Sequence, residues 1–170
     1  MPTDLADAMG LGKTVMTISL IFANQRGRSR NHNIEMENPE EESNFVMGGT
    51  LIVCPMALCG QWKDELETHS RWPGSISVFI HYGCDKTNDP REIAIYDVVL
   101  TTYGVLQSSF KSNSNSKASI FHRVNWYRVV LDETHTIKSL KAQVAQSAFA
   151  PTAYCRWCLI GELFLLQKKM

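Results

Sequence analysis

The first residues able to do chemistry are Gly10-Leu11-Gly12-Lys13-Thr14, whose types and spacing are typical of a phosphate-binding loop. The glycines would let the backbone approach a polyphosphate and point successive N–H groups at it. Lys13 adds a cation for the β and γ phosphates, and the Thr14 hydroxyl suits Mg²⁺. The strict pattern has a glycine at position 7, where this chain has Asp7, so an NTP site also requires an acidic motif elsewhere.

That acidic motif is Asp132-Glu133, which directly follows the apolar run at 129–131. In an open parallel sheet, ligands bind beyond the carboxyl ends of the strands. Asp132 would hold the Mg²⁺ shared with Thr14, and Glu133 would orient or deprotonate the attacking water. His135 could sense the γ-phosphate. The alternative, an acidic pair that caps a helix, is disfavoured because the lysine loop is also present.

Apolar patterns predict the elements that position these groups. Strands are expected at 50–54, 76–81, 97–101, 129–131 and 156–160, and helices at 13–23, 58–69 and 138–149. Their alternation predicts an α/β fold with a parallel sheet and right-handed crossovers. Residues 25–48 are rich in Arg and Glu and predict a disordered insertion, and 111–119 a surface loop. Residues 163–166 would either continue the sheet or form an exposed apolar tail.

Composition narrows the class of protein. The 170 residues, 44% of them hydrophobic, predict one domain with a core. Lys+Arg and Asp+Glu number 17 each, so overall charge indicates neither a nucleic acid nor a membrane. No apolar run reaches the roughly 18 residues of a membrane span. The five cysteines are too few and irregular for a disulfide framework, and Cys155 and Cys158 would face opposite sides of a strand, which disfavours a metal site.

Four stretches in order resemble motifs of the Snf2-type ATPases of helicase superfamily 2. Residues 5–14 resemble motif I, which accounts for Asp7, and residues 51–62, 97–106 and 129–139 resemble motifs Ia, Ib and II. The details are most similar to the RING-finger-containing branch, which includes helicase-like transcription factor and the post-replication repair translocases of yeast and plants. The resemblance implies a RecA-like, three-layer P-loop NTPase lobe.

The same resemblance implies ATP and Mg²⁺ as cofactors, and double-stranded DNA or chromatin as partner. Hydrolysis would drive movement along DNA, in nuclear DNA repair or chromatin remodelling. By this likeness, five residues lie near the DNA-tracking face: Pro55, Gln61, Thr101, Thr102 and Tyr103. Hydroxyls and backbone amides at strand ends can hold phosphates without reading sequence. From spacing alone, a strand-ending proline and a β-rich corner remain the simpler interpretations.

Some positions depart from the family pattern. Thr134 replaces an alanine, a small change expected to leave Asp132 and Glu133 in place, and Ser139 replaces an asparagine. Residues 158–170 begin like motif III but keep only its glycine, Gly161, with Ile160, Glu162 and Leu163 where Thr, Thr and Pro are usual.

We therefore expect a truncated chain with a partial lobe at 1–161 and a divergent tail at 162–170. The second RecA-like lobe and the RING domain of the family would lie outside it, leaving this chain inactive or nearly so. A non-catalytic ATP- or DNA-binding module is the main alternative. A small P-loop kinase is disfavoured because the sequence shows neither a lid nor a second substrate site.

Overall fold

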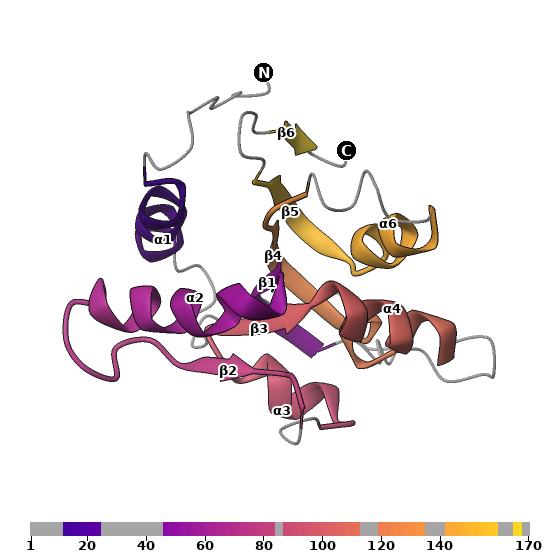
Figure 1. The fold of residues 1–170 in the computed structure, drawn as a ribbon. Helices are drawn as coiled ribbons and strands as arrows, with labels where there is room; N and C mark the ends of the chain where they lie inside the picture. Colours follow the sequence, from indigo (N-terminus) through magenta and orange to yellow (C-terminus); the bar gives the residue numbers. More distant parts are fainter. Residues whose placement is uncertain are drawn as a thin grey trace, which may run out of the picture.

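A computed structural model describes residues 12–24, 46–83, 87–112, 119–134, 142–159 and 165–167. One six-stranded sheet runs through the molecule in the order β2-β3-β1-β4-β5-β6 (Figure 1). The strands are β1 (Val46–Cys54), β2 (Val78–Ile80), β3 (Val98–Thr102), β4 (Val124–Leu131), β5 (Ala153–Cys158) and β6 (Leu165–Gln167). The first five are parallel, and β6 pairs antiparallel with β5. The expected α/β fold with a parallel sheet is confirmed.

Helices cover both faces of the sheet and make three layers (Figure 1). One face packs against α1 (Lys13–Ala23) and α2 (Met56–Thr68). The other packs against α3 (Pro90–Ala94), α4 (Tyr103–Ser112), the 3₁₀ helix η3 (Ile120–His122) and α6 (Ala142–Phe149). Among the described residues, no helix is long and apolar enough to cross a membrane.

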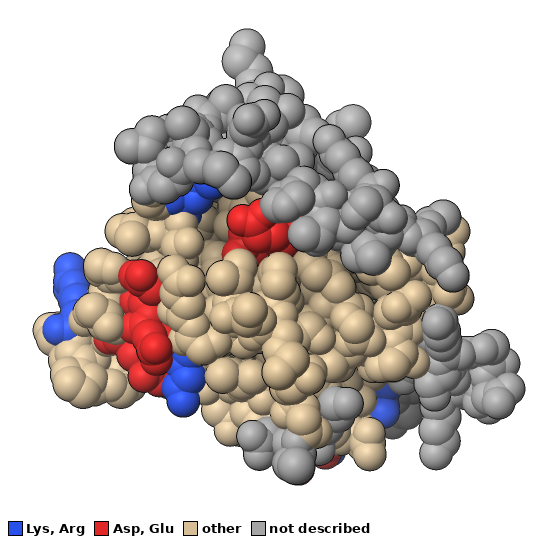
Figure 2. Space-filling model, viewed as in Figure 1, with Lys and Arg blue, Asp and Glu red and all other residues tan. Residues whose placement is uncertain are grey.

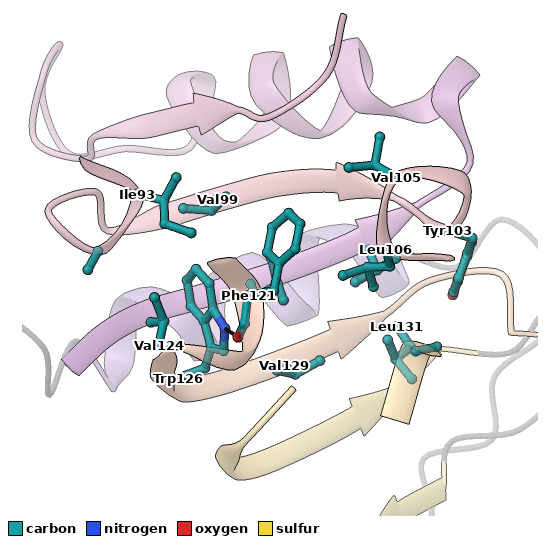
Figure 3. Close-up of a cluster of buried hydrophobic side chains, with 14 of the residues drawn as sticks. Ile93, Val99, Tyr103, Val105, Leu106, Phe121, Val124, Trp126, Val129 and Leu131 are labelled. Atoms are coloured by element: carbon teal, nitrogen blue, oxygen red, sulfur yellow. Dashed lines mark hydrogen bonds between the residues drawn. The ribbon is translucent and has the colours of Figure 1, made fainter. Parts of the chain in front are cut away.

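The central strands are apolar on both faces because each lies between two helical layers. In β1, Leu51 and Val53 enter one buried cluster, and Ile52 enters the other. Figure 3 shows the first cluster, in which Phe121 and Trp126 fill the space between the sheet and the helices. The Trp126 indole donates to the Phe121 carbonyl (3.0 Å), so this buried N–H is satisfied.

β1 begins four residues earlier than the sequence predicts, and its early part includes two positions that only glycine fits. A Cβ on Gly49 would lie 2.4 Å from the Asp97 carbonyl oxygen, and one on Gly48 would lie 2.5 Å from a Val124 methyl carbon. These contacts exclude a side chain, although glycine usually weakens a strand. The insertion predicted for 25–48 therefore does not extend past residue 45. Its remaining residues, 25–45, lie outside the described chain.

Most other predicted elements are confirmed within a few residues. The helix predicted at 58–69 is α2, and the strands at 76–81, 97–101 and 129–131 correspond to β2, β3 and β4. β5 begins and ends before the predicted 156–160. Residues 165–167 extend the sheet as β6, in agreement with the first of the two alternatives for this segment. The helices α3 and α4 were not predicted from the sequence.

Candidate nucleotide site

The start of α1 is the described end of the predicted phosphate-binding loop. Gly12, at its N-cap, has φ 78°, a left-handed conformation that costs glycine little, and its carbonyl accepts from the Met16 N–H (2.8 Å). N–H groups in the first turn of a helix have no acceptor within the helix, and that end carries partial positive charge. Lys13 and Thr14 lie in this turn, both half-buried. Gly10 and Leu11 lie outside the described residues.

The acidic motif lies at the carboxyl end of β4. Asp132 is fixed to the neighbouring strand because its N–H donates to the Val53 carbonyl (2.8 Å). Its Oδ1 accepts from the Glu133 N–H (2.9 Å), and Glu133 has φ 51°. A left-handed backbone is uncommon outside glycine, and such strain concentrates at functional sites. His135 lies outside the described residues.

Two aromatic side chains from opposite faces of the sheet hold Asp132 in place. The Trp62 indole, on α2, donates to Asp132 Oδ2 (2.8 Å). The Tyr103 hydroxyl, at the start of α4, donates to the Asp132 carbonyl (2.6 Å). Figure 3 shows Tyr103 at the edge of the buried cluster, with its hydroxyl directed toward the segment after β4. Neither bond was predicted from the sequence.

The pKa of Asp132 reflects its burial, its hydrogen bonds and the charge of Lys13. Burial raises the pKa of Asp132, and the hydrogen bonds from Trp62 and the Glu133 N–H, together with the charge of Lys13, oppose this rise. Figure 2 shows a basic surface by the start of α1 and an acidic one by the end of β4, on the same face of the molecule. We call Lys13, Asp132 and Glu133 the charged edge.

Beside the charged edge, the surface forms an open hollow beyond the carboxyl ends of β1 and β3. Its volume is about 410 Å³. The lining comes from the end of β1, the start of α2, the segment after β2, and the β3–α4 junction: Cys54, Pro55, Met56, Tyr82, Thr102, Tyr103, Gly104, Val105 and Ser108. None of these described lining residues is Lys, Arg, Asp or Glu. We call this surface the β1–β3 hollow.

The five residues predicted near DNA are only partly brought together. Pro55, Thr102 and Tyr103 line the β1–β3 hollow. Gln61 is exposed on α2 but is not among the lining residues. Thr101 is fully buried, and its hydroxyl donates to the His81 carbonyl (3.2 Å).

Thr102 also has a structural role, because its Oγ1 accepts from the Val105 N–H (3.3 Å) at the start of α4. This is the geometry of a helix N-cap. Asp132 therefore depends on a helix whose first residue, Tyr103, follows a capping threonine.

The threonine that replaces the usual alanine of motif II is also engaged. Thr134 is buried, and both its N–H and its hydroxyl donate to the Leu159 carbonyl (each 3.1 Å). Leu159 in turn donates its N–H to the Leu131 carbonyl (2.7 Å). The substitution thus adds a bond between the acidic segment and the end of β5. Ser139 and residues 160–164 lie outside the described chain.

Comparison with known proteins gives consistent matches. Residues 4–162 match the family model of the SNF2-related domain. The chain is 54% identical over 170 aligned residues to DNA repair protein RAD5B of Arabidopsis thaliana, covering 92% of this chain and 13% of that protein. It is 30% identical to helicase-like transcription factor CHR27 of the same plant, covering 79% of this chain and 19% of that protein.

A solved structure shares the fold: the SWI2/SNF2 ATPase core of Sulfolobus solfataricus in complex with dsDNA. The TM-score is 0.63 at 22% identity, and the match covers 92% of this chain and 26% of that one. This chain therefore spans a small part of the length of the proteins it resembles.

Proposed function

Because the chain belongs to the family of SNF2-related domains, we propose that it is the ATP-binding lobe of a DNA-dependent ATPase. In the longer protein, hydrolysis would be coupled to movement on double-stranded DNA during repair or chromatin remodelling, in the nucleus. The names of the relatives, a DNA repair protein and a helicase-like transcription factor, support this setting. The observation that carries the proposal is the charged edge, where Lys13 acts on Asp132 and Trp62 holds the carboxylate.

ATP would bind at the start of α1. The backbone of Gly10, Leu11 and Gly12 would cradle the phosphates, and Lys13 would neutralise their charge. His135 would contact the γ-phosphate.

Mg²⁺ suits the residues present, because this ion is usually held by one or two carboxylates together with substrate phosphates and water. Asp132 and the Thr14 hydroxyl would supply the protein oxygens. Bound there, the ion would neutralise charge on the transferring phosphoryl group.

The remaining roles belong to side chains of this chain. Glu133 would orient and deprotonate the attacking water. Its backbone is fixed by the bond from its N–H to Asp132, so the two carboxylates keep a defined arrangement. Trp62 and Tyr103 would position Asp132 without touching ATP.

We also propose that DNA runs along the β1–β3 hollow and its rim. Pro55 and Gln61 would lie against the phosphate backbone, which hydroxyls, amides and backbone N–H groups hold without reading sequence. Thr101, Thr102 and Tyr103 are buried and would support this surface from inside.

Titration with Mg·ATP tests the nucleotide site. We expect Lys13→Ala to weaken binding roughly 10- to 100-fold, because a hydrogen bond to a charged group is worth about 1.5–3 kcal/mol. The matched control is Lys63→Ala, which removes a lysine of α2 paired with Glu67 (3.9 Å) and should leave affinity unchanged. No binding by the wild-type chain, or equal binding by Lys13→Ala, would contradict the proposal. Binding without DNA-stimulated hydrolysis would favour a module without turnover.

A further inference from the structure

Two cysteines meet between the β1–β3 hollow and the charged edge. Cys54 ends β1 and Cys59 lies on α2, and their sulfur atoms are 3.5 Å apart. Both side chains are buried, but Cys54 is among the residues that line the hollow, which gives a small reagent a route to the pair. Both are free thiols in this structure.

We propose that Cys54 and Cys59 are an oxidative modification site, converted by peroxide to a reversible disulfide that weakens the nucleotide site. The two sulfurs are already in contact and need to approach by about 1.5 Å to reach a bond of about 2.05 Å. The two cysteines are five positions apart, so the bond would close a short loop from the end of β1 to α2.

The contact between the two sulfurs favours Cys59 as the attacking group. The hydrogen bond between them lowers the pKa of Cys59, whereas the same bond and burial raise the pKa of Cys54. The thiolate is the reactive form of cysteine.

The reaction balances in two steps. The Cys59 thiol gives up its proton, and the thiolate attacks one oxygen of hydrogen peroxide; the O–O bond breaks, Cys59 becomes a sulfenic acid, and the departing hydroxide takes up that proton as water. The Cys54 sulfur then attacks the Cys59 sulfur, the S–O bond breaks, and the Cys54 proton leaves with the hydroxide as a second water. The two sulfurs are oxidised and one molecule of peroxide is reduced.

The consequence for the nucleotide site follows from the position of Cys59 on α2. Trp62 lies on the same helix and donates to Asp132 Oδ2. Cys59 and Trp62 also share one buried cluster, whose packing transmits a shift of the first turns of α2. Drawing Cys59 toward Cys54 therefore displaces the group that orients Asp132. This step rests on the proposed ATP site, but formation of the disulfide does not.

The other described cysteines do not form such a pair. Cys158 packs into the cluster around Trp126, whereas Cys155 lies near Arg128 and the Tyr127 carbonyl, on the opposite face of β5. Among the residues that the structure describes, no three His, Cys, Asp or Glu side chains are grouped to hold a metal ion, so the Cys54–Cys59 pair fits oxidation better than metal binding.

The test is peptide mapping of the full chain after treatment with hydrogen peroxide. Trypsin releases residues 31–63 as one peptide, whose only cysteines are Cys54 and Cys59. We expect this peptide to lose the mass of two hydrogen atoms and to regain it with dithiothreitol. The change should disappear in Cys59→Ser and persist in Cys155→Ser. A peptide that keeps two alkylatable thiols, or gains only oxygen atoms, would overturn the proposal.

A second measurement needs no substitution. Phenylarsine oxide bonds to two neighbouring thiols at once and releases water, so the reduced wild-type chain should form an adduct on peptide 31–63. Absence of that adduct would overturn the proposal even if Cys59→Ser failed to fold.

Mg·ATP titration of the reduced and oxidised chain then separates the two proposals. We expect the oxidised chain to bind Mg·ATP several-fold more weakly, with recovery after reduction. Equal affinity would overturn the link from the disulfide to the nucleotide site. If the reduced chain bound no Mg·ATP, the proposed function would fail while the modification site would stand on the peptide result.

Discussion

The charged edge and the β1–β3 hollow lie next to each other but differ in chemistry. At the charged edge, a lysine and two acidic side chains are half-buried, and burial raises the pKa of Asp132. The described lining of the hollow carries no charge and is open to solvent. In Figure 2 the acidic and basic side chains over the middle and end of α2 contrast with the uncharged surface over its first turn and over α4.

The charged edge and the β1–β3 hollow are built on the same two helices, α2 and α4. The walls of the hollow come partly from α2 and α4, and these same helices supply Trp62 and Tyr103, which hold Asp132. A ligand pressing on the hollow would therefore act on the groups that orient the carboxylate. The two regions differ in charge, but residues of α2 and α4 contribute to both.

Asp132→Asn should have the largest effect on Mg·ATP binding. It removes the carboxylate from the charged edge and leaves the β1–β3 hollow intact. Loss of a partner that merely orients a metal ligand typically costs roughly 10- to 100-fold in affinity, and loss of the ligand itself should cost at least as much. We expect Mg²⁺ to strengthen ATP binding by the wild-type chain but not by the variant. Calorimetric titration with and without Mg²⁺ measures this, and equal Mg²⁺ dependence would remove Asp132 from the site.

The same variant should also change how the free energy of unfolding depends on pH. Because the pKa of Asp132 is raised in the folded chain, its contribution to stability is fully present below the unfolded pKa and is lost as pH rises through the folded value. Asparagine does not titrate. The free energy of unfolding of Asp132→Asn, relative to wild type and without Mg²⁺, should therefore increase as pH rises from about 4 toward 7. Urea unfolding at the two pH values measures it, and a relative decrease would contradict the raised pKa.

Trp62→Phe should have the next largest effect on nucleotide binding. It removes the N–H that bonds to Asp132 Oδ2 and keeps an aromatic ring in the core. We expect Mg·ATP affinity to fall by roughly 10-fold, the lower end of the range for partners of metal ligands. Trp126→Phe is the matched control, because it also removes a buried indole bond, to the Phe121 carbonyl, but far from the charged edge. If both variants lost affinity equally, the effect would reflect stability rather than positioning.

Thr102→Ala should have the smallest effect on Mg·ATP binding, because the threonine lines the β1–β3 hollow and does not contact the charged edge. Its hydroxyl caps α4 through the Val105 N–H, and loss of such a cap typically lowers the free energy of unfolding by about 1 kcal/mol. Chemical denaturation measures this change. Mg·ATP affinity should stay within about two-fold of wild type. A larger loss would show that the position of Asp132 depends on the cap of α4, and that the two regions are not independent.

The sheet was predictable from sequence because its central strands contain continuous apolar runs at 51–54, 98–100 and 129–131, each buried by helices on both sides. The two missed helices had local signals. Asp89 caps α3 through the Arg91 N–H (2.9 Å), with Pro90 at the first helical position, a recognised start signal. At α4, Thr102 has the side chain of a cap, but the preceding threonine and β-branched residues favour continuing the strand.

The charged edge was predictable because its residues lie in two contiguous motifs. The support of Asp132 was not, since Trp62 and Tyr103 lie 70 and 29 residues away in sequence and reach it only through the packing of α2 and α4. The same holds for Thr101, whose burial depends on a bond to the carbonyl of His81, after β2. Hydroxyl groups at strand ends look alike in sequence, whether they face solvent or the interior.

The most direct test of the account is the NMR signal of the Trp62 indole N–H in the full chain. Four tryptophans give four indole signals, and Trp62→Phe and Trp126→Phe identify the two of interest. Adding Mg·ATP should shift the Trp62 signal, because its acceptor, Asp132, takes up the ion, and should leave the Trp126 signal unchanged. A Trp62 signal that stays fixed at saturating Mg·ATP would contradict the claim that the end of β4 and the start of α1 form one nucleotide site.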